Sequence, residues 1–390
     1  MPFAAALSTL PRFDQAADEV CSALAAQGIE HPHLAIAFFS FHHSDAAEEL
    51  AQRLQARLAP RALVGCIGEA VIGNDQEIEG MPALSVWVGK WGSAVGLETF
   101  HLVLERTSDG FSLLGWPDAL VGADPARSAM LILGDPFTFP TDFFLKQMND
   151  DYGGLRVMGG MASGISGAGQ CRLMRDGAVV TQGAVGVLLQ GEIGLRPIVS
   201  QGCRPIGRHL VITKANESVI HELGGQPPLT HLQELWQTSS EREQQLIQQG
   251  LHIGRVINEF QEQFRRGDFL VRNLAGLDRQ TGALAITDRV RVGQTVQFHV
   301  RDAETADEDL RALLEQDLSR HEKKPAGALV FSCNGRGTRL FPEPHHDAQT
   351  VRTKAGSIPL AGFFAMGELG PVGGQNFIHG FTASIALFEE

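Results

Sequence analysis

The sequence predicts an α/β (α+β) protein of two domains, each a mixed β-sheet layered with helices. Three observations support this class. The chain has 390 residues, which is more than a single hydrophobic core usually organises. Apolar segments such as "LAIAFFSF" are typical of strands covered on both faces, and they alternate with amphipathic helical segments. A pattern of strand, helix or loop, strand and strand recurs along the chain.

The recurring pattern occurs three times, and in each copy the second strand ends in a glycine cluster. The first copy reads "LAIAFFSF", "SDAAEELAQRLQARL", "ALVGCIGEAVIG" and "ALSVWVGKW". The second reads "AMLILGDPF", "TDFFLKQMND", "LRVMGGMASGISG" and "GAVGVLLQG", and the third reads "GALVFSCNGRG", a connection with His and Asp, "LAGFFAMGELGP" and "HGFTASIALF". Self-similarity of this kind indicates repeated structural units.

Several helices follow from apolar spacing and from capping residues. Residues 14–27 predict a helix that stops at Gly28. Ser44 is placed to cap a second helix, whose Leu50, Leu54 and Leu58 share one face. Residues 302–321 predict a third helix.

Residues 200–300 differ in character, because short strands are divided there by glycine and aspartate turns. This pattern predicts an antiparallel meander. Residues 241–266 fit either helix or strand, and we favour a helix followed by a strand. Glycine and proline concentrate at 191–207, so we divide the chain into domains 1–200 and 201–390. The second would contain the meander and the third repeat.

The charge and cysteine content exclude several classes of protein. The net charge is −13 and no basic stripe stands out, so we expect no nucleic acid and no membrane as partner. No apolar run is long enough to span a membrane, and no leader is evident, which together predict a cytoplasmic location. The five cysteines are scattered and lack a Cys-x-x-Cys pair, which predicts reduced thiols without a disulfide frame or zinc site.

We expect no cofactor and no metal. Glycine-rich "GISGAG" lacks the remaining features of a phosphate loop or a dinucleotide site. The histidine pairs 42–43 and 345–346 could suggest a metal, but adjacent residues on a strand point to opposite faces.

The C-terminal segments "VFSCNGRG" and "AGFFAMGELGPVGGQNFIHGFTASIALF" resemble the signature of the FIST family, named for F-box and intracellular signal transduction proteins. The resemblance extends over about residues 30–390 and includes "LVGCIGEAVI" and "DFLVRNLAGLD". It implies FIST N-terminal and C-terminal domains that form an intracellular sensory module for small ligands such as amino acids. The chain departs from the expected pattern at Ile67 and Met366. It contains no kinase, cyclase or F-box segment, so a separate signalling output protein is expected.

The turn after the third repeat's first strand is the leading candidate for ligand binding. It contains Cys333, Asn334, Gly335, Arg336 and Gly337. A guanidinium can hold a carboxylate through two parallel hydrogen bonds, and flanking glycines let backbone N–H groups turn toward an anion. The alternative is a structural arginine that pairs with Glu368 or caps a turn.

An amino acid also needs an acid for its ammonium group. Glu368, which follows Gly367, and Glu69 are the candidates. They stand in the glycine clusters that end strands, and clefts beyond strand ends are common ligand sites. Simple tight turns would equally explain these glycines.

Three further side chains are candidates for the site. Cys333 and Cys66 each follow a strand beside glycine, and either could face a ligand or be an inert buried thiol. His379 could bond to a ligand or belong to the core. No catalytic spacing accompanies the cysteines, so we expect a non-catalytic sensor; an F-box-related adaptor is the alternative, and a thiol-dependent enzyme is a third possibility. We expect Arg336→Ala to abolish ligand-induced stabilisation and to leave the fold intact.

Overall fold

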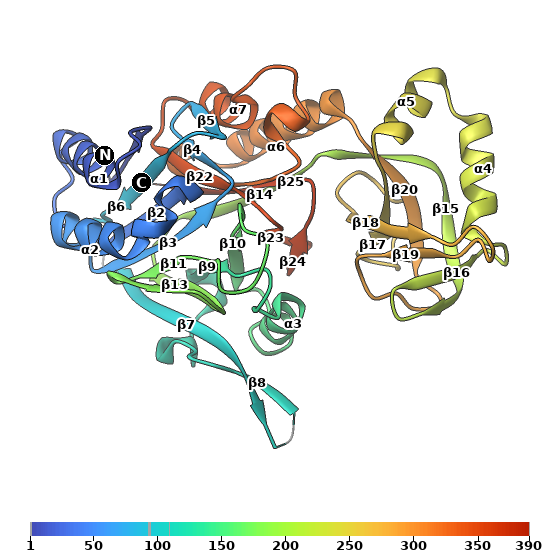
Figure 1. Cartoon of the computed structure of the whole chain (residues 1–390), viewed down its shortest axis with the longest axis horizontal. Coiled ribbons are helices and arrows are strands. Elements are labelled where there is room, and N and C mark those ends of the chain that lie inside the picture. Colours follow the sequence, from blue (N-terminus) through green and yellow to red (C-terminus); the bar gives the residue numbers. More distant parts are fainter. Residues whose placement is uncertain (1, 93–94, 109, 390) are drawn as a thin grey trace. The chain divides into compact units, whose positions relative to one another are not determined.

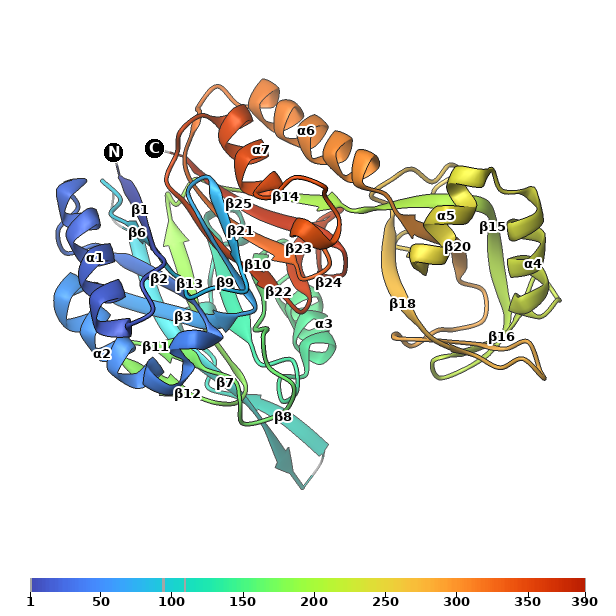
Figure 2. The same cartoon turned by 45° about the horizontal axis from the view of Figure 1, so that its top comes forward.

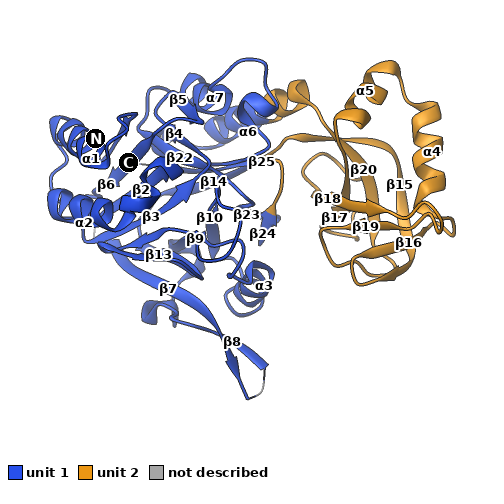
Figure 3. Ribbon diagram, viewed as in Figure 1, with its two compact units in different colours: residues 1–199, 310–378, 382–390 blue, residues 200–309, 379–381 orange. Residues whose placement is uncertain are grey.

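The computed structural model describes residues 2–92, 95–108 and 110–389. The chain forms two compact units (Figure 3). The first contains residues 1–199, 310–378 and 382–390, and the second contains residues 200–309 and 379–381. The border near residue 200 therefore coincides with the division drawn from the sequence. The third repeat, however, belongs to the unit of the first two repeats and not to the meander unit.

The second unit is a closed antiparallel barrel with two helices. The barrel order is β15 (Cys203–Asn216), β16 (Val219–Leu223), β19 (Leu284–Ile286), β18 (Phe269–Leu277), β17 (Leu251–Val256) and β20 (Thr295–Arg301). Its helices are α4 (Pro228–Thr238) and α5 (Glu241–Gln249), labelled in Figure 1. The helix-then-strand interpretation of residues 241–266 is confirmed by α5 and β17, although β17 ends at Val256.

The first unit contains the three repeats, and all three have the same strand order. In the first repeat, β2 (Leu34–Ser40) lies parallel to β3 (Ala62–Gly68) and antiparallel to β6 (Leu84–Gly89). The second repeats this with β9 (Ser128–Gly134), β10 (Arg156–Met161) and β13 (Ala184–Gly191). The third does so with β21 (Pro325–Cys333), β22 (Leu360–Ala365) and β25 (Thr382–Glu389). The predicted repeats are therefore confirmed as structural units.

The strand that follows each glycine cluster joins the sheet of another repeat. β4 (Ala70–Gly73) leaves the first repeat and pairs with β22 of the third. β23 (Glu368–Val372) leaves the third and pairs with β10 of the second. β11 (Leu173–Arg175) leaves the second and pairs with β3 of the first. This cyclic exchange ties the three repeats into one body, which explains why the third repeat does not fold with the barrel.

Further strands complete the three sheets. Their orders are β1-β6-β2-β3-β11-β12, β24-β23-β10-β9-β13-β7-β8 and β14-β25-β21-β22-β4-β5. The added strands are β1 (Phe3–Ser8), β5 (Gln76–Glu79), β7 (Val95–Thr107), β8 (Gly110–Leu114), β12 (Ala178–Val180), β14 (Leu195–Gln201) and β24 (Gln375–His379). The helices are α1 (Phe13–Ala26), α2 (Ala47–Leu58), α3 (Thr141–Asp151), α6 (Ala303–Arg320) and α7 (His346–Ala355). Figure 2 shows α1 and α2 together beside the strands of the first repeat. The mixed-sheet α/β class is confirmed.

Apolar strands of the repeats are buried along their whole length, as their composition predicts. Every residue of β2, β3 and β9 is buried, because helices or neighbouring sheets cover both faces. Phe3, Trp87, Trp91 and Phe388 form an aromatic group in this core, with the rings of Phe3 and Trp87 stacked 4.9 Å apart. Within the described part of the chain, no helix has the length and hydrophobicity needed to cross a membrane.

The start of α2 differs from the prediction. Ser44 does not cap the helix; it lies inside a 3₁₀ turn, Phe41–Ala46, that precedes α2. The chain enters this turn directly from β2, whose last residue, Ser40, accepts a hydrogen bond from the Ala83 backbone N–H at 2.9 Å. The expectation that the neighbouring histidines lie on strands is wrong. His42 and His43 are part of this 3₁₀ turn, and His345 and His346 lie at the start of α7.

Candidate functional site

The glycine clusters of the three repeats meet in the first unit. Ser163, from the second repeat, accepts a hydrogen bond at 2.8 Å from the backbone N–H of Glu69 in the first. The Met366 N–H, from the third repeat, donates to the Met161 carbonyl at 2.9 Å, and the Met161 N–H donates to the Gly367 carbonyl at 2.9 Å. Turns far apart in the sequence are thus bonded to one another. The three glycine clusters therefore form one junction and are not separate surface turns.

Close backbone approach explains one glycine of each repeat. Gly65, Gly159 and Gly362 lie opposite the equivalent residue of the first strand. A Cβ on Gly362 would lie 1.9 Å from the Val330 carbonyl oxygen, and one on Gly159 would lie 1.8 Å from that of Ile132. No side chain fits at such distances. These three glycines therefore serve strand packing.

Arg336 is buried beside the junction and has a carboxylate partner within the protein. Its side chain is 0% exposed, and its Nε and Nη2 each donate to Asp347 at 2.7 Å. Its third nitrogen, Nη1, is buried without a hydrogen-bond partner among the described residues. The guanidinium also lies 5.2 Å from the centre of the Phe341 ring. The structural partner considered for this arginine was Glu368, and the structure pairs it with Asp347.

Asp347 lies in the first turn of α7 and is held by several donors. Ser332 Oγ donates to it at 2.6 Å, and His346 Nδ1 lies 3.0 Å from its second oxygen. Burial alone would raise the pKa of Asp347, but the charge and hydrogen bonds of Arg336 outweigh burial and hold the pKa well below its usual range. Arg336 and Asp347 therefore form a fixed charged pair. Removing Arg336 would leave a buried carboxylate, which revises our expectation that Arg336→Ala leaves the fold intact.

Glu77 adds a second carboxyl group to this buried cluster. It lies in β5, and its Oε1 accepts a hydrogen bond from the Ala348 N–H at 2.9 Å. Its Oε2 is buried without a hydrogen-bond partner in the described part of the chain. Burial and the nearby charge of Asp347 raise the pKa of Glu77 to about 8. Sequence reasoning missed this residue because "QEIEG" has the composition of an exposed turn.

Glu368 is the most unusual polar residue of the junction. It is 0% exposed, and its Oε2 accepts hydrogen bonds from Thr382, from the backbone N–H at 3.1 Å and from Oγ1 at 2.7 Å. Its Oε1 has no hydrogen-bond partner among the described residues. Burial raises the pKa of Glu368 to about 8, although the hydrogen bonds from Thr382, the nearby Cys333 thiol and the charge of Arg336 act in the opposite direction.

The repeats show what occupies this position elsewhere. Glu368 pairs with Gly160, which follows Gly159, the close-packed glycine of the second repeat. In the other two repeats the equivalent strand residues are Val71 and Leu173, which pair with Phe363 and Cys66. Both Val71 and Leu173 are fully buried. The fold therefore accepts an apolar side chain at this position, and the carboxyl group of Glu368 is not needed to build the junction.

The turn at 333–337 forms the accessible edge of the cluster. Cys333, Asn334 and Gly335 are partly exposed, whereas Arg336 is buried. The Gly335 N–H points to Cys333 Sγ at 3.4 Å, and Asn334 Oδ1 is buried without a hydrogen-bond partner in the described residues. Gly337 has a φ of +58°, which a residue with a side chain rarely adopts.

The turn was predicted to bind a carboxylate, and a carboxylate of the protein, that of Glu79, lies beside it. The backbone N–H of Thr338, directly after Gly337, donates to Glu79 at 3.0 Å, and its hydroxyl donates to the same carboxylate at 2.8 Å. Glu79 thus occupies the outer side of the turn. Cys333 and Asn334, in the same turn, are partly exposed.

The remaining candidates fall into different places. Glu69 is partly exposed and bonded to Arg339, whereas Glu368 keeps a buried oxygen without a hydrogen-bond partner in the described chain. Cys66 is fully buried, and burial raises the pKa of its thiol well above the ordinary value. His379 is buried at the end of β24 and belongs to the second unit. In the described residues, no three His, Cys, Asp or Glu side chains are placed to hold a metal ion.

Two cavities of the first unit lie at other residues. One, of about 760 Å³, is lined by Pro2, Lys90, Trp91, Gly92, Glu192, Gly194, Lys323 and Glu389. The other, of about 310 Å³, is lined by Arg156, residues 195–199, Leu313, Gln316, Asp317, Arg320 and His321.

Comparison with known proteins identifies the family. The FIST N domain matches residues 33–226, and the FIST C domain matches residues 228–371. The chain belongs to the FIST family. FIST domains are sensory domains of signal transduction. An uncharacterised protein of Mycobacterium tuberculosis (strain H37Rv) is 44% identical over 357 residues, which are 92% of this chain and 91% of that protein. An uncharacterised protein of Mycobacterium bovis is 45% identical over 359 residues, with the same coverage of 92% and 91%.

The FIST matches and the compact units divide the chain differently. The FIST N match takes in the first two repeats and runs on to residue 226, which lies in the barrel unit. The FIST C match contains the rest of the barrel and most of the third repeat. The two matched segments share sheets. β4, from the FIST N match, pairs with β22 of the FIST C match, and β23, which begins in the FIST C match, pairs with β10 of the FIST N match.

Proposed function

We propose that this FIST protein is a non-catalytic sensory module that binds a small ligand at the junction of the three repeats, and that an amino acid is the first candidate. The proposed site consists of Cys333 and Asn334 at the accessible edge, Glu368 behind them, and the Arg336 guanidinium. Gly335, Gly337 and Gly367 shape the backbone around these side chains. The ligand-bound state would be passed to a separate signalling output protein.

One observation carries this proposal: Glu368 is a buried carboxyl group, one oxygen of which lacks a hydrogen-bond partner among the described residues, at a position where the other repeats have Val71 and Leu173. Leaving a buried polar atom unpaired costs about 1–3 kcal/mol. Such a cost is unusual in a native protein and calls for an explanation. A ligand group that bonds to Oε1 would remove the cost when it binds.

The chemistry of the cluster favours a ligand with both a donor and an acceptor. Glu368 Oε1 and Asn334 Oδ1 need donors, which an ammonium group supplies. Arg336 Nη1 needs an acceptor, which a carboxylate or carbonyl oxygen supplies. An α-amino acid carries both groups on one carbon atom. The charge of Arg336 acts on Glu368, so the two residues are near enough to interact, which supports a ligand that carries both groups.

A thermal-shift screen of amino acids, small organic acids and amines tests the proposal. The wild type should be stabilised by at least one amino acid, and Glu368→Gln should lose that shift, because the amide cannot provide the negative charge that an ammonium group requires. Glu192→Gln serves as the matched control, because it makes the same change at an exposed carboxylate of the same unit, and it should keep the shift. If all compounds fail to stabilise the wild type, or if Glu368→Gln responds as the wild type does, the proposal is wrong.

A further inference from the structure

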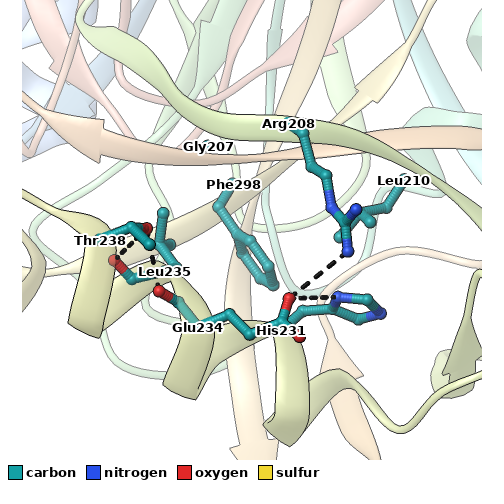
Figure 4. Close-up of a pocket in the computed structure, with 8 residues that line it drawn as sticks. All are labelled: Gly207, Arg208, Leu210, His231, Glu234, Leu235, Thr238 and Phe298. Atoms are coloured by element: carbon teal, nitrogen blue, oxygen red, sulfur yellow. Dashed lines mark hydrogen bonds and ion pairs between the residues drawn. The ribbon is translucent and has the colours of Figure 1, made fainter.

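A second cavity, in the barrel unit, has the composition of a small-molecule site. Its volume is about 340 Å³, within the range of roughly 300–1,000 Å³ that ligand pockets occupy. It lies between α4 and the barrel strands β15 and β20, as Figure 4 shows. Its lining consists of Gly207, Arg208, Leu210, His231, Glu234, Leu235, Thr238 and Phe298. The side chains of Leu210, Leu235 and Phe298 give the cavity an apolar wall.

His231 lines this cavity and has a nitrogen without a hydrogen-bond partner among the described residues. The side chain is buried, with 5% of its surface exposed, and Nε2 lies 2.7 Å from the Leu223 carbonyl oxygen. A carbonyl oxygen only accepts hydrogen bonds, so Nε2 carries the hydrogen and Nδ1 of the neutral ring is an acceptor. Nδ1 is buried without a hydrogen-bond partner in the described residues.

Two charged side chains complete the polar end of the cavity. Glu234 Oε2 lies 3.6 Å from His231 Nδ1, and it lies 3.4 Å from Arg208 Nη2 (Figure 4). Glu234 and Arg208 are exposed, so their pairing is weak and can be exchanged for contacts with a ligand. The cavity therefore offers two acceptors, His231 Nδ1 and Glu234, and one donor, Arg208, at the same end.

We propose that this cavity binds a small neutral molecule with an apolar body and a hydroxyl group, such as a phenol. The hydroxyl would donate its hydrogen to His231 Nδ1 or to Glu234, and its oxygen would accept from Arg208. The apolar body would pack on Leu235 and Phe298, where an aromatic ring gains from contact with another ring.

Related molecules fit less well. A hydrocarbon of the same shape would leave Nδ1 buried and unpaired, and a site built to bond a hydroxyl discriminates strongly against an analogue that lacks it. A carboxylate in place of the hydroxyl would face the like charge of Glu234. This site lies wholly in the barrel unit, so it is separate from the amino-acid site proposed above.

Calorimetric titration of the full-length protein with 4-ethylphenol, ethylbenzene and 4-ethylbenzoate tests this inference. 4-Ethylphenol should bind at least tenfold more tightly than either of the others. His231→Leu should reduce the preference for 4-ethylphenol over ethylbenzene to less than threefold while ethylbenzene still binds. His221→Leu is the control and should keep the preference, because it makes the same change at a histidine of β16 that does not line the cavity.

A second variant covers the case in which His231→Leu does not fold. Leu210→Trp fills the cavity with protein and should abolish 4-ethylphenol binding. The inference is overturned if 4-ethylphenol does not bind the wild type, if 4-ethylbenzoate or ethylbenzene binds equally well, or if Leu210→Trp binds as the wild type does.

Discussion

Arg336 grips Asp347 with two parallel hydrogen bonds of 2.7 Å, and both side chains are buried. The arginine that stands between two glycines in the sequence therefore has a structural partner within the chain. One of its nitrogens, Nη1, still lacks a hydrogen-bond partner in the described residues. Its bonds to Asp347 tie the turn at 333–337 to α7, and Nη1 is the donor that the proposed ligand would use.

The first prediction concerns this ion pair. Arg336→Ala should lower the free energy of unfolding by about 3–5 kcal/mol, because it leaves the Asp347 carboxylate buried without its cation. Arg352→Ala, which removes an exposed pair with Asp75 from the same helix, should cost about 1 kcal/mol or less. Urea denaturation measures both. An equal loss of unfolding free energy in the two variants would show that the buried ion pair stabilises the protein no more than the exposed one does.

The second prediction concerns pH and Glu368. Its pKa is about 8 in the folded protein against an ordinary value of 4.5, so the folded state binds a proton that the unfolded state releases. The contribution of Glu368 to stability is therefore full below about pH 4.5 and is lost progressively as pH rises toward 8. Glu368→Gln does not titrate, so its stability should gain on the wild type between pH 5 and pH 8 by a few kcal/mol. A difference that is the same at both pH values would contradict the raised pKa.

The third prediction concerns cysteine accessibility. Cys333 is partly exposed, whereas Cys21, Cys66, Cys171 and Cys203 are buried. A thiol reagent should modify one cysteine per native chain quickly, and Cys333→Ser should remove this fast phase. An amino acid bound at the proposed site should slow the modification of Cys333. Fast labelling of Cys66 in the native protein would show that the junction is more open than the structure indicates.

The fourth prediction concerns the glycines. Gly362→Ala should destabilise the first unit by several kcal/mol, because its Cβ would lie 1.9 Å from the Val330 carbonyl oxygen and the strands would have to separate. Gly167→Ala, in the glycine cluster of the second repeat, places its Cβ where no atom lies within 4 Å and should be close to neutral. Thermal denaturation distinguishes the two. Similar melting temperatures would show that close packing of β21 and β22 does not require glycine.

Much of the fold could be predicted from the sequence because its repeats carry local signals. Apolar strands, amphipathic helices and glycine clusters recur in the same order, and the structure gives each repeat the same pairing of strands. The destination of the strand after each glycine cluster could not be predicted. β4 and β23 join the sheets of other repeats, and no local pattern reports pairing between residues such as Gly73 and Ala361 or Gly160 and Glu368, which lie 288 and 208 positions apart.

The candidate site could be predicted only in part. Arg336 and Glu368 were singled out because a cation between glycines and an acid in a glycine cluster are unusual, and the structure shows that both are buried. Asp347 and Glu77 were missed as partners, because each lies in an ordinary polar segment and acquires its buried position from tertiary packing. The pairing of Glu69 with Arg339 also depends on segments 270 positions apart.

The affinity of an amino acid for the wild type at two pH values tests the central claim most directly. If the ammonium group binds the ionised form of Glu368, whose pKa is about 8, the competent fraction rises from a few hundredths at pH 6.5 to about one half at pH 8. Calorimetry with the amino acid that gives the largest thermal shift should then show about fifteenfold tighter binding at pH 8, and Glu368→Gln should bind weakly at both. Equal affinity of the wild type at the two pH values, or undiminished binding by Glu368→Gln, would contradict a ligand site at Glu368.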